Sequence, residues 1–350
     1  MKRTKFGIAL VTAVQEMIRT AVLVEKLGYD SVWTPDETVG YEMEYGRGAV
    51  IPDAFVSLTA IAVKTRKLLL GTSVVDALIR APVKTAQISA TLDSLSHGRL
   101  LLGVGGSEAG NHEPFGVSTD HPLSRLRETI DVMRLLWKSN YARRANFRGD
   151  HYSLTDAYLR IHPYRSSGPP IYIAAFGPKM LSLVGKVGNG WIPFGHTPET
   201  YVDRLKGPIR DSLEKNGRSL RDIDAACIVP TSISGDGQKA RRDAARVGKA
   251  YLVWSTDNLR SILPGLAHPG IRQTQLKTLS NLSQLRELCK KVPDDIARRV
   301  TVSGTKQDCA DQIKRFVDVG CNHLIFAPVA TSKMKRVEIL KGLGTVLSKF

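Results

Sequence analysis

The sequence predicts one (β/α)8 barrel, residues 1–350, with two insertions. Short apolar runs alternate with amphipathic helical segments along the whole chain, and the alternation occurs eight times. No G-x-G-x-x-G follows the first apolar run, which argues against a Rossmann sheet. A strand that a helix returns to its sheet lies parallel to its neighbour, so we expect an all-parallel barrel.

Strands are expected where three to seven mostly apolar residues end in small or polar ones. In chain order they are Phe6–Leu10, Ser31–Trp33, Leu68–Val74, Leu100–Val104, Ile171–Ala174, Gly190–Phe194, Ala225–Pro230 and His323–Ala327. Helices are expected where apolar residues recur every three or four positions. These segments are Val14–Leu27, Ala54–Val63, Val83–Leu95, Leu123–Trp137, Met180–Val187, Thr200–Glu214, Lys239–Trp254 and Gln307–Val319, with a terminal helix in Ser332–Phe350.

Two segments interrupt the repeat and are predicted as insertions. Residues 139–170 alternate aromatic and polar residues around Gly149-Asp150, a pattern that predicts a β-hairpin laid over a barrel end. Residues 256–301 contain three prolines and are expected to form helices with loops before the last βα unit. Insertions of this kind often shape the substrate mouth.

The composition excludes several classes of function. The net charge is +17, but the basic residues are spread out without an aromatic stripe, so no nucleic-acid partner is expected. The positive net charge is explained either by solvated charges on the surface or by binding of an anionic small molecule. No run of about 18 apolar residues occurs, so we expect no membrane span, and the first 17 residues serve better as a strand than as a signal peptide. The four cysteines form no C-x-x-C pair, which predicts no metal, no disulfide and a cytoplasmic protein.

Chemistry in a (β/α)8 barrel lies beyond the carboxyl ends of the strands. The segment 68–113 contains two such ends, after the third and fourth strands. The polar residues that follow these strands are Ser73, Asp76, Glu108, Asn111 and His112. We therefore predict a site there.

The helix after the fifth strand opens with Phe176-Gly177-Pro178-Lys179-Met180. Backbone N–H groups and the helix dipole make such an opening an anion site, and Gly177 allows close approach of a ligand. Lys179 adds a positive charge. The alternative is an ordinary helix start with Pro178 in its first turn.

These segments resemble the bacterial-luciferase-like superfamily, in its branch that depends on coenzyme F420, an 8-hydroxy-5-deazaflavin. The resemblance also covers GYDSVWTPD at 28–36, PIYIAAFGPKM at 170–180, GNGW at 188–191 and the segment 302–323. It extends over nearly the whole chain. It implies the barrel fold, the cofactor and an assembly of two or more identical chains.

The resemblance also implies roles for individual residues. A cis peptide bond at Ser73-Val74 would back the deazaflavin ring, and Asp36 and Asn111 would contact it. Glu108 aligns with an acidic residue near the reacting carbon, where burial would raise its pKa; its plainer role is to cap a turn. The turn expected to bind the cofactor phosphate comprises Ala174, Ala175, Phe176, Gly177, Pro178, Lys179 and Met180.

Glu37 stands where family members that oxidise sugars or alcohols often carry His. This favours a reductase similar to methylenetetrahydromethanopterin reductase, with a pterin one-carbon carrier as substrate. Such reductases commonly have Glu inside the first strand, where this chain has FGIAL at 6–10. The expected reaction is hydride transfer between F420 and a C=N or C=O carbon, with Glu108 and Glu37 handling protons.

Three alternatives remain open at this point. They are an FMN-dependent monooxygenase, an F420-dependent alcohol or sugar-phosphate dehydrogenase, and a catalytically silent ligand-binding barrel. Trp33 and Trp191 are expected near the barrel mouth, where their fluorescence would report on cofactor binding.

Overall fold

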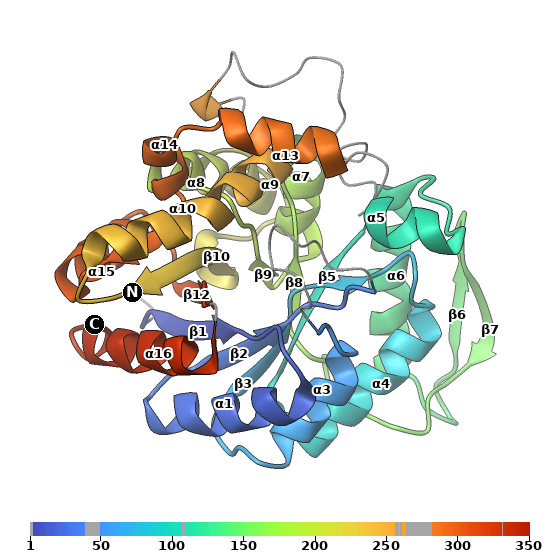
Figure 1. Ribbon diagram of the computed structural model, residues 1–350. Helices are drawn as coiled ribbons and strands as arrows, with labels where there is room; N and C mark the ends of the chain where they lie inside the picture. The colour runs from blue at the N-terminus through green and yellow to red at the C-terminus, as the bar shows by residue number, and fades with distance from the viewer. Residues whose placement is uncertain are drawn as a thin grey trace.

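The computed structural model describes residues 3–38, 50–106, 109–255, 259, 261–263, 282–330 and 332–350. Within them, eight parallel strands close into a barrel with helices around it (Figure 1). In the order of the ring these strands are β1 (Lys5–Ala9), β2 (Ser31–Thr34), β3 (Leu69–Thr72), β5 (Leu100–Gly105), β8 (Ile171–Ile173), β9 (Gly190–Trp191), β10 (Asp224–Ile233) and β12 (His323–Pro328). β12 pairs with β1 and closes the ring, so the predicted barrel is confirmed.

The outer helices follow the strands as expected. They are α1 (Val14–Lys26), α3 (Ala54–Ala62), α4 (Pro82–Leu95), α6 (Pro122–Trp137), α7 (Pro178–Val187), α8 (Pro198–Arg204), α9 (Arg210–Lys215), α10 (Gly237–Trp254), α15 (Lys306–Asp318) and α16 (Lys333–Leu347). The predicted helix at 200–214 is interrupted at Gly207, which has non-helical φ and ψ of −105° and −109°. Pro208 follows it and has no N–H to donate, which explains the separation of α8 from α9.

The end of the chain departs from the predicted repeat. A short extra strand, β11 (Val302–Gly304), pairs with the end of β10, so α15 precedes the eighth strand. The helix that follows the eighth strand is α16. Another short strand, β4 (Val75–Asp76), pairs in parallel with the last residues of β5.

The structure describes residues 259, 261–263 and 282–301 of the insertion at 256–301. Its described part includes α13 (Leu282–Lys291) and α14 (Asp294–Arg298), consistent with the helices expected there. None of the helices in the described ranges has the length and apolar character needed to cross a bilayer.

The insertion at 139–170 forms the expected hairpin, β6 (Ala145–Arg148) with β7 (Ser153–Ala157). At the turn of the hairpin, the Glu128 carboxylate of α6 accepts hydrogen bonds from the backbone N–H groups of Asp150 (2.8 Å), His151 (2.9 Å) and Tyr152 (3.1 Å). The hairpin therefore lies beside α6 on the outside of the barrel (Figure 1). The expectation that it covers a barrel end is wrong, because its polar turn is held by a helix side chain.

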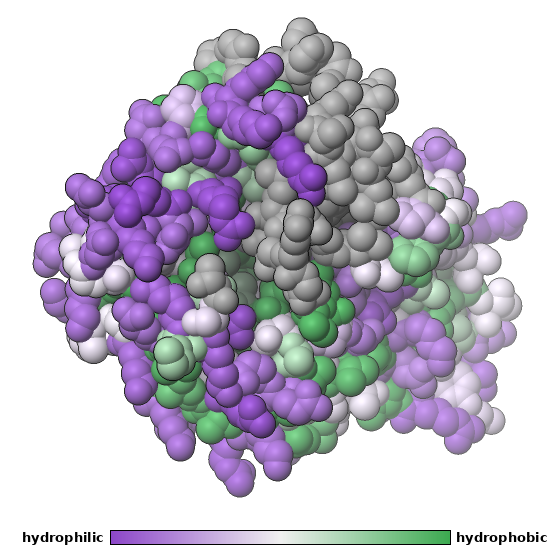
Figure 2. Space-filling model, in the orientation of Figure 1, coloured by the Kyte–Doolittle hydropathy of each residue, from purple (hydrophilic) through white to green (hydrophobic). Residues whose placement is uncertain are grey.

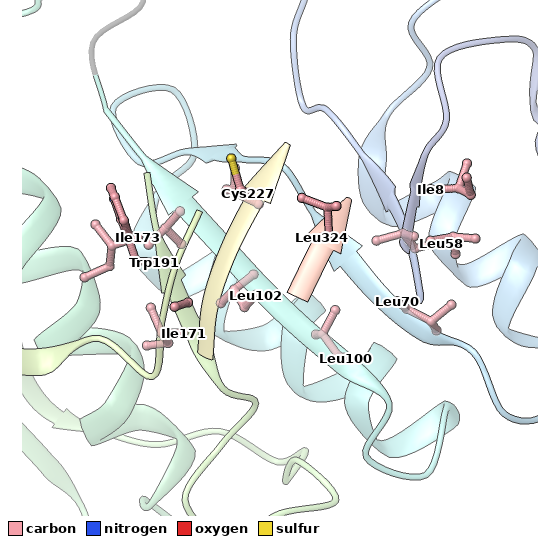
Figure 3. Packing of buried hydrophobic residues seen from close by; sticks show 14 of the residues in the cluster. Ile8, Leu58, Leu70, Leu100, Leu102, Ile171, Ile173, Trp191, Cys227 and Leu324 are labelled. Atoms are coloured by element: carbon pink, nitrogen blue, oxygen red, sulfur yellow. The ribbon is translucent and has the colours of Figure 1, made fainter. Parts of the chain in front are cut away.

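Alternation along the strands separates two apolar layers. Leu100 and Leu102 of β5 belong to the layer between strands and helices, whereas Leu101 belongs to a smaller cluster inside the barrel. Figure 3 shows Leu100 and Leu102 among other residues of the outer layer. Because both faces of each strand are covered, the strand sequences are continuous apolar runs.

Trp33 fills the inside of the barrel. A Cβ at Gly71 would lie 2.1 Å from the indole ring, so only glycine leaves room for it. The ring contacts Tyr172 and His323, each at 5.4 Å between centroids. Burial, with a smaller contribution from Lys5, lowers the pKa of His323 to about 3, so the imidazole is neutral. The expectation that Trp33 lies near the mouth is wrong, because glycines on neighbouring strands leave space for its ring inside the barrel.

Candidate active site

A pocket of about 300 Å³ lies where the eight barrel strands end. Residues that end or follow seven of the strands line it, namely Ala9, Pro35, Ser73, Gly105, Ala174, Ile192 and Ala327, and the long strand β10 contributes Ile228 from its middle. This is the end of the barrel at which the sequence predicts chemistry. The same pocket brings together segments from position 9 to position 336 of the chain.

The peptide bond Ser73-Val74 is cis, as the resemblance implies. Both residues line the pocket directly after β3. Val74 packs with the interior cluster that contains Ala174 and Ile192. This part of the wall is apolar and can face a flat ring.

Asp36 is held by Arg80. The guanidinium donates two hydrogen bonds to the Asp36 carboxylate, both at 2.6 Å, and a third to Asp53. The side chain of Asp36 is only 7% exposed and lines the pocket. The Arg80 guanidinium lies 5.3 Å from the centre of the Phe55 ring. This bidentate geometry fixes the orientation of the Asp36 carboxylate.

The same cluster shifts the pKa values of its members. The hydrogen bond to Asp36 is the largest cause that raises the pKa of Arg80. Burial pushes the pKa of Asp53 upward, but the Val56 N–H and Arg80 outweigh burial and hold this pKa below its usual value. Arg80 is therefore charged at any physiological pH.

We expect Arg80→Met to lower the free energy of unfolding by about 2 kcal/mol, because it leaves the buried Asp36 carboxylate without its cation. The figure is reduced from that of a fully buried pair because Arg80 is 26% exposed. Urea unfolding measures it. The control Arg19→Met removes an exposed pair at 3.4 Å to Glu16 and should change stability by less than about 0.5 kcal/mol. Equal losses in both variants would contradict this role for Arg80.

Asn111 is buried and lines the pocket, and its Oδ1 accepts the backbone N–H of Thr38 at 3.1 Å. Asp76 also lines the pocket and lies 2.6 Å from Nε2 of the fully buried His112. His112, one of the polar residues predicted at this end of the barrel, does not itself line the pocket. It lies behind Asp76 and orients that carboxylate.

Glu37 lines the pocket next to Asp36 and is half-buried. Its role in proton transfer stays a prediction. Glu108, the other predicted acid, lies outside the described residues. Its role stays a prediction.

The predicted phosphate turn contributes Ala174, Phe176, Gly177 and Met180 to the pocket wall. Gly177 begins α7 and no side chain caps this end, so backbone N–H groups of the first turn remain available. Three predicted members do not line the pocket. Ala175 is buried and its carbonyl accepts the Trp191 indole N–H at 2.9 Å, while Pro178 and Lys179 are exposed.

Five pocket residues come from helices in which the sequence gives no sign of a site. Arg246, Val247, Tyr251 and Trp254 lie on α10, and Arg336 lies on α16. The pocket residues of α10 share one face of that helix. This spacing could have indicated a site, but residues that pack in a hydrophobic core show the same spacing. Trp254, rather than the fully buried Trp33 and Trp191, is the tryptophan that lines the pocket. The expectation that Trp191 lies at the mouth is wrong, because its indole N–H donates a hydrogen bond to the buried carbonyl of Ala175.

Comparison with known proteins agrees with this geometry. Residues 4–323 match the family model of the luciferase-like monooxygenases. This chain belongs to the luciferase-like family. A relative, the F420-dependent glucose-6-phosphate dehydrogenase of Amycolatopsis mediterranei (strain U-32), is 31% identical over 321 residues, 89% of this chain and 88% of the relative.

Two solved structures share the luciferase-like fold. An F420-dependent secondary alcohol dehydrogenase, solved with an F420-acetone adduct, has a TM-score of 0.80 at 21% identity. The coenzyme F420 dependent tetrahydromethanopterin reductase from Methanopyrus kandleri has a TM-score of 0.80 at 22% identity. Each comparison covers 99% of both chains. At this identity the likeness establishes the barrel fold.

Proposed function

We propose that this luciferase-like protein is an oxidoreductase that uses coenzyme F420 to transfer hydride to or from a carbon of a small molecule. One observation carries the proposal: Ser73 and Val74 line a single pocket together with Asp36 and Asn111. The resemblance assigns all of these residues to the deazaflavin. The name of the 31% identical relative supports the same cofactor.

The residues present fit such a cofactor. Val74, Ala174 and Ile192 offer an apolar wall for a flat ring and would exclude water from it. The uncapped start of α7 at Gly177 offers N–H donors and the positive end of a helix dipole to a phosphate. When bound there, F420 would supply a hydride donor or acceptor at carbon five of its ring.

The described carboxyl groups that line the pocket belong to Asp36, Glu37 and Asp76. Asp36 is paired with Arg80, and Asp76 is hydrogen-bonded to His112, so both are suited to orient groups. Glu37 lines the same chamber and would hold or move a proton at a heteroatom of the substrate. Glu108 is the second candidate for this proton.

Within this class, we propose reduction of a C=N or C=O carbon, as in a methylenetetrahydromethanopterin reductase. Glu37 supports this direction, because it replaces the His that alcohol-oxidising family members often carry. The second candidate is oxidation of a sugar phosphate, which the name of the Amycolatopsis relative favours.

A titration of the purified protein with F420 and, separately, FMN tests the proposal. We expect F420 to bind tightly and to quench the fluorescence of Trp254, which lines the pocket. F420 absorbance then distinguishes the reactions, because methylenetetrahydromethanopterin would oxidise reduced F420 and glucose 6-phosphate would reduce oxidised F420. Preference for FMN with oxygen uptake would indicate a monooxygenase, and binding of neither cofactor would indicate a silent barrel.

A further inference from the structure

We propose that Arg246 and Arg336 form an anion-binding wall that holds a phosphate or carboxylate group of the substrate. The inference rests on the proposed function, since it takes the rest of the pocket as the place of the cofactor and the reacting carbon. It adds a substrate class: molecules whose reacting carbon is joined to an anionic group.

Both arginines line the main pocket, although they are 90 positions apart in the sequence. Arg246 lies on α10, which follows β10, and Arg336 lies on α16, which follows β12. Since β10 and β12 are neighbours in the barrel, their helices bring the two side chains to one side of the pocket. Pro328, Val329 and Ala330 complete this part of the wall.

Neither guanidinium makes a hydrogen bond or a close ion pair with the part of the chain that the structure describes. The negative charge that acts on Arg336 is that of Glu16, which is already paired with Lys333 at 3.0 Å and Arg19 at 3.4 Å. Arg336 is half-buried, and burial lowers its pKa more than Glu16 raises it. A guanidinium that is partly removed from water and has no acidic partner gains free energy when it binds an anion.

A second hollow on the surface shares Arg246 and Val329 with the main pocket. Its lining includes two further basic residues, Lys239 and Lys335, and two acidic residues, Asp243 and Glu338. The arginines therefore lie at the edge of the pocket that faces the surface between α10 and α16. Figure 2 shows a largely hydrophilic surface over these helices, so an anionic group can approach there through water. Positive charge at a pocket entrance raises the local concentration of anionic ligands.

The wall and the expected cofactor phosphate lie on different strands of the barrel. Gly177 follows β8, which is two strands from β10 and three from β12 around the ring of eight. The acidic residues of the pocket lie elsewhere again, since Asp36 follows β2 and Asp76 is in β4. The glutamyl tail of F420 is attached through its phosphate and so begins near α7. The arginines are therefore assigned to the substrate.

The test uses F420-loaded protein and inorganic phosphate as the probe, followed by Trp254 fluorescence and by calorimetry. Arg246→Gln and Arg336→Gln should each weaken phosphate binding about tenfold, the effect of one charged hydrogen bond of roughly 1.4 kcal/mol. The affinity for F420 should stay within about twofold. Arg242→Gln on α10 and Lys341→Gln on α16 are matched controls, because both side chains are exposed and neither lines the pocket.

Three results would overturn the assignment. Equal weakening in the arginine variants and the controls would indicate non-specific charge. No effect of either arginine variant on phosphate binding would remove the site. Loss of F420 affinity, with unchanged affinity for the deazaflavin that lacks phosphate and tail, would assign the arginines to the cofactor. Failure of the unaltered protein to bind F420 is a separate result that concerns the proposed function, and apoprotein then tests the arginines in the same way.

Discussion

Glu37→Gln should lower kcat by about two to four orders of magnitude and leave F420 binding within about twofold, the range expected when a general acid or base is lost. Glu37 lines the pocket, and the other described acids there, Asp36 and Asp76, are held by Arg80 and His112. Gln keeps the size of the side chain and cannot exchange the proton. Single-turnover change in F420 absorbance measures the effect on hydride transfer.

The pH profile distinguishes proton transfer from simple positioning. Loss of a general acid or base should remove one limb of the pH dependence of kcat/KM, whereas loss of a binding contact should leave its shape unchanged. Glu37→Asp keeps the carboxyl group and should recover part of the rate. Glu108→Gln is the parallel variant. If it alone abolishes the limb, the proton belongs to Glu108 and the role proposed for Glu37 is wrong.

Gly103→Ala should lower the free energy of unfolding by about 3 kcal/mol, at the upper end of the usual cost of overpacking. A Cβ at this position would lie 1.9 Å from the backbone oxygen of Thr72. The obstacle is a strand of the barrel rather than a flexible side chain, so β3 or β5 must shift. Thr72 precedes the cis Ser73-Val74 bond, so the same shift would move the pocket wall and weaken F420 binding.

Gly235→Ala is the matched control, because a Cβ there meets no atom within 4 Å. Its stability should change by less than about 0.5 kcal/mol. Thermal or urea unfolding of both variants measures the difference. Similar stability of the two would show that the barrel tolerates the added methyl group at Gly103, contrary to the packing of β3 against β5.

The sequence alone predicts the barrel and the place of its site. Strands and helices depend on the spacing of apolar residues within a few positions, and the eight predicted strands are all present. The residues that follow strands such as β3 and β5 are then brought to one end by the parallel topology. The cis Ser73-Val74 bond was implied by resemblance, since no local pattern specifies it.

Only the tertiary structure decides which distant side chains meet. Arg80 reaches Asp36 across 44 positions, and Arg246 and Arg336 share a pocket because β10 and β12 are neighbours. Trp33 lies inside the barrel because glycines face it from adjacent strands. The spacing of apolar residues shows which face of a helix or strand is buried. Closure of the barrel and packing between strands determine which residues lie opposite that face.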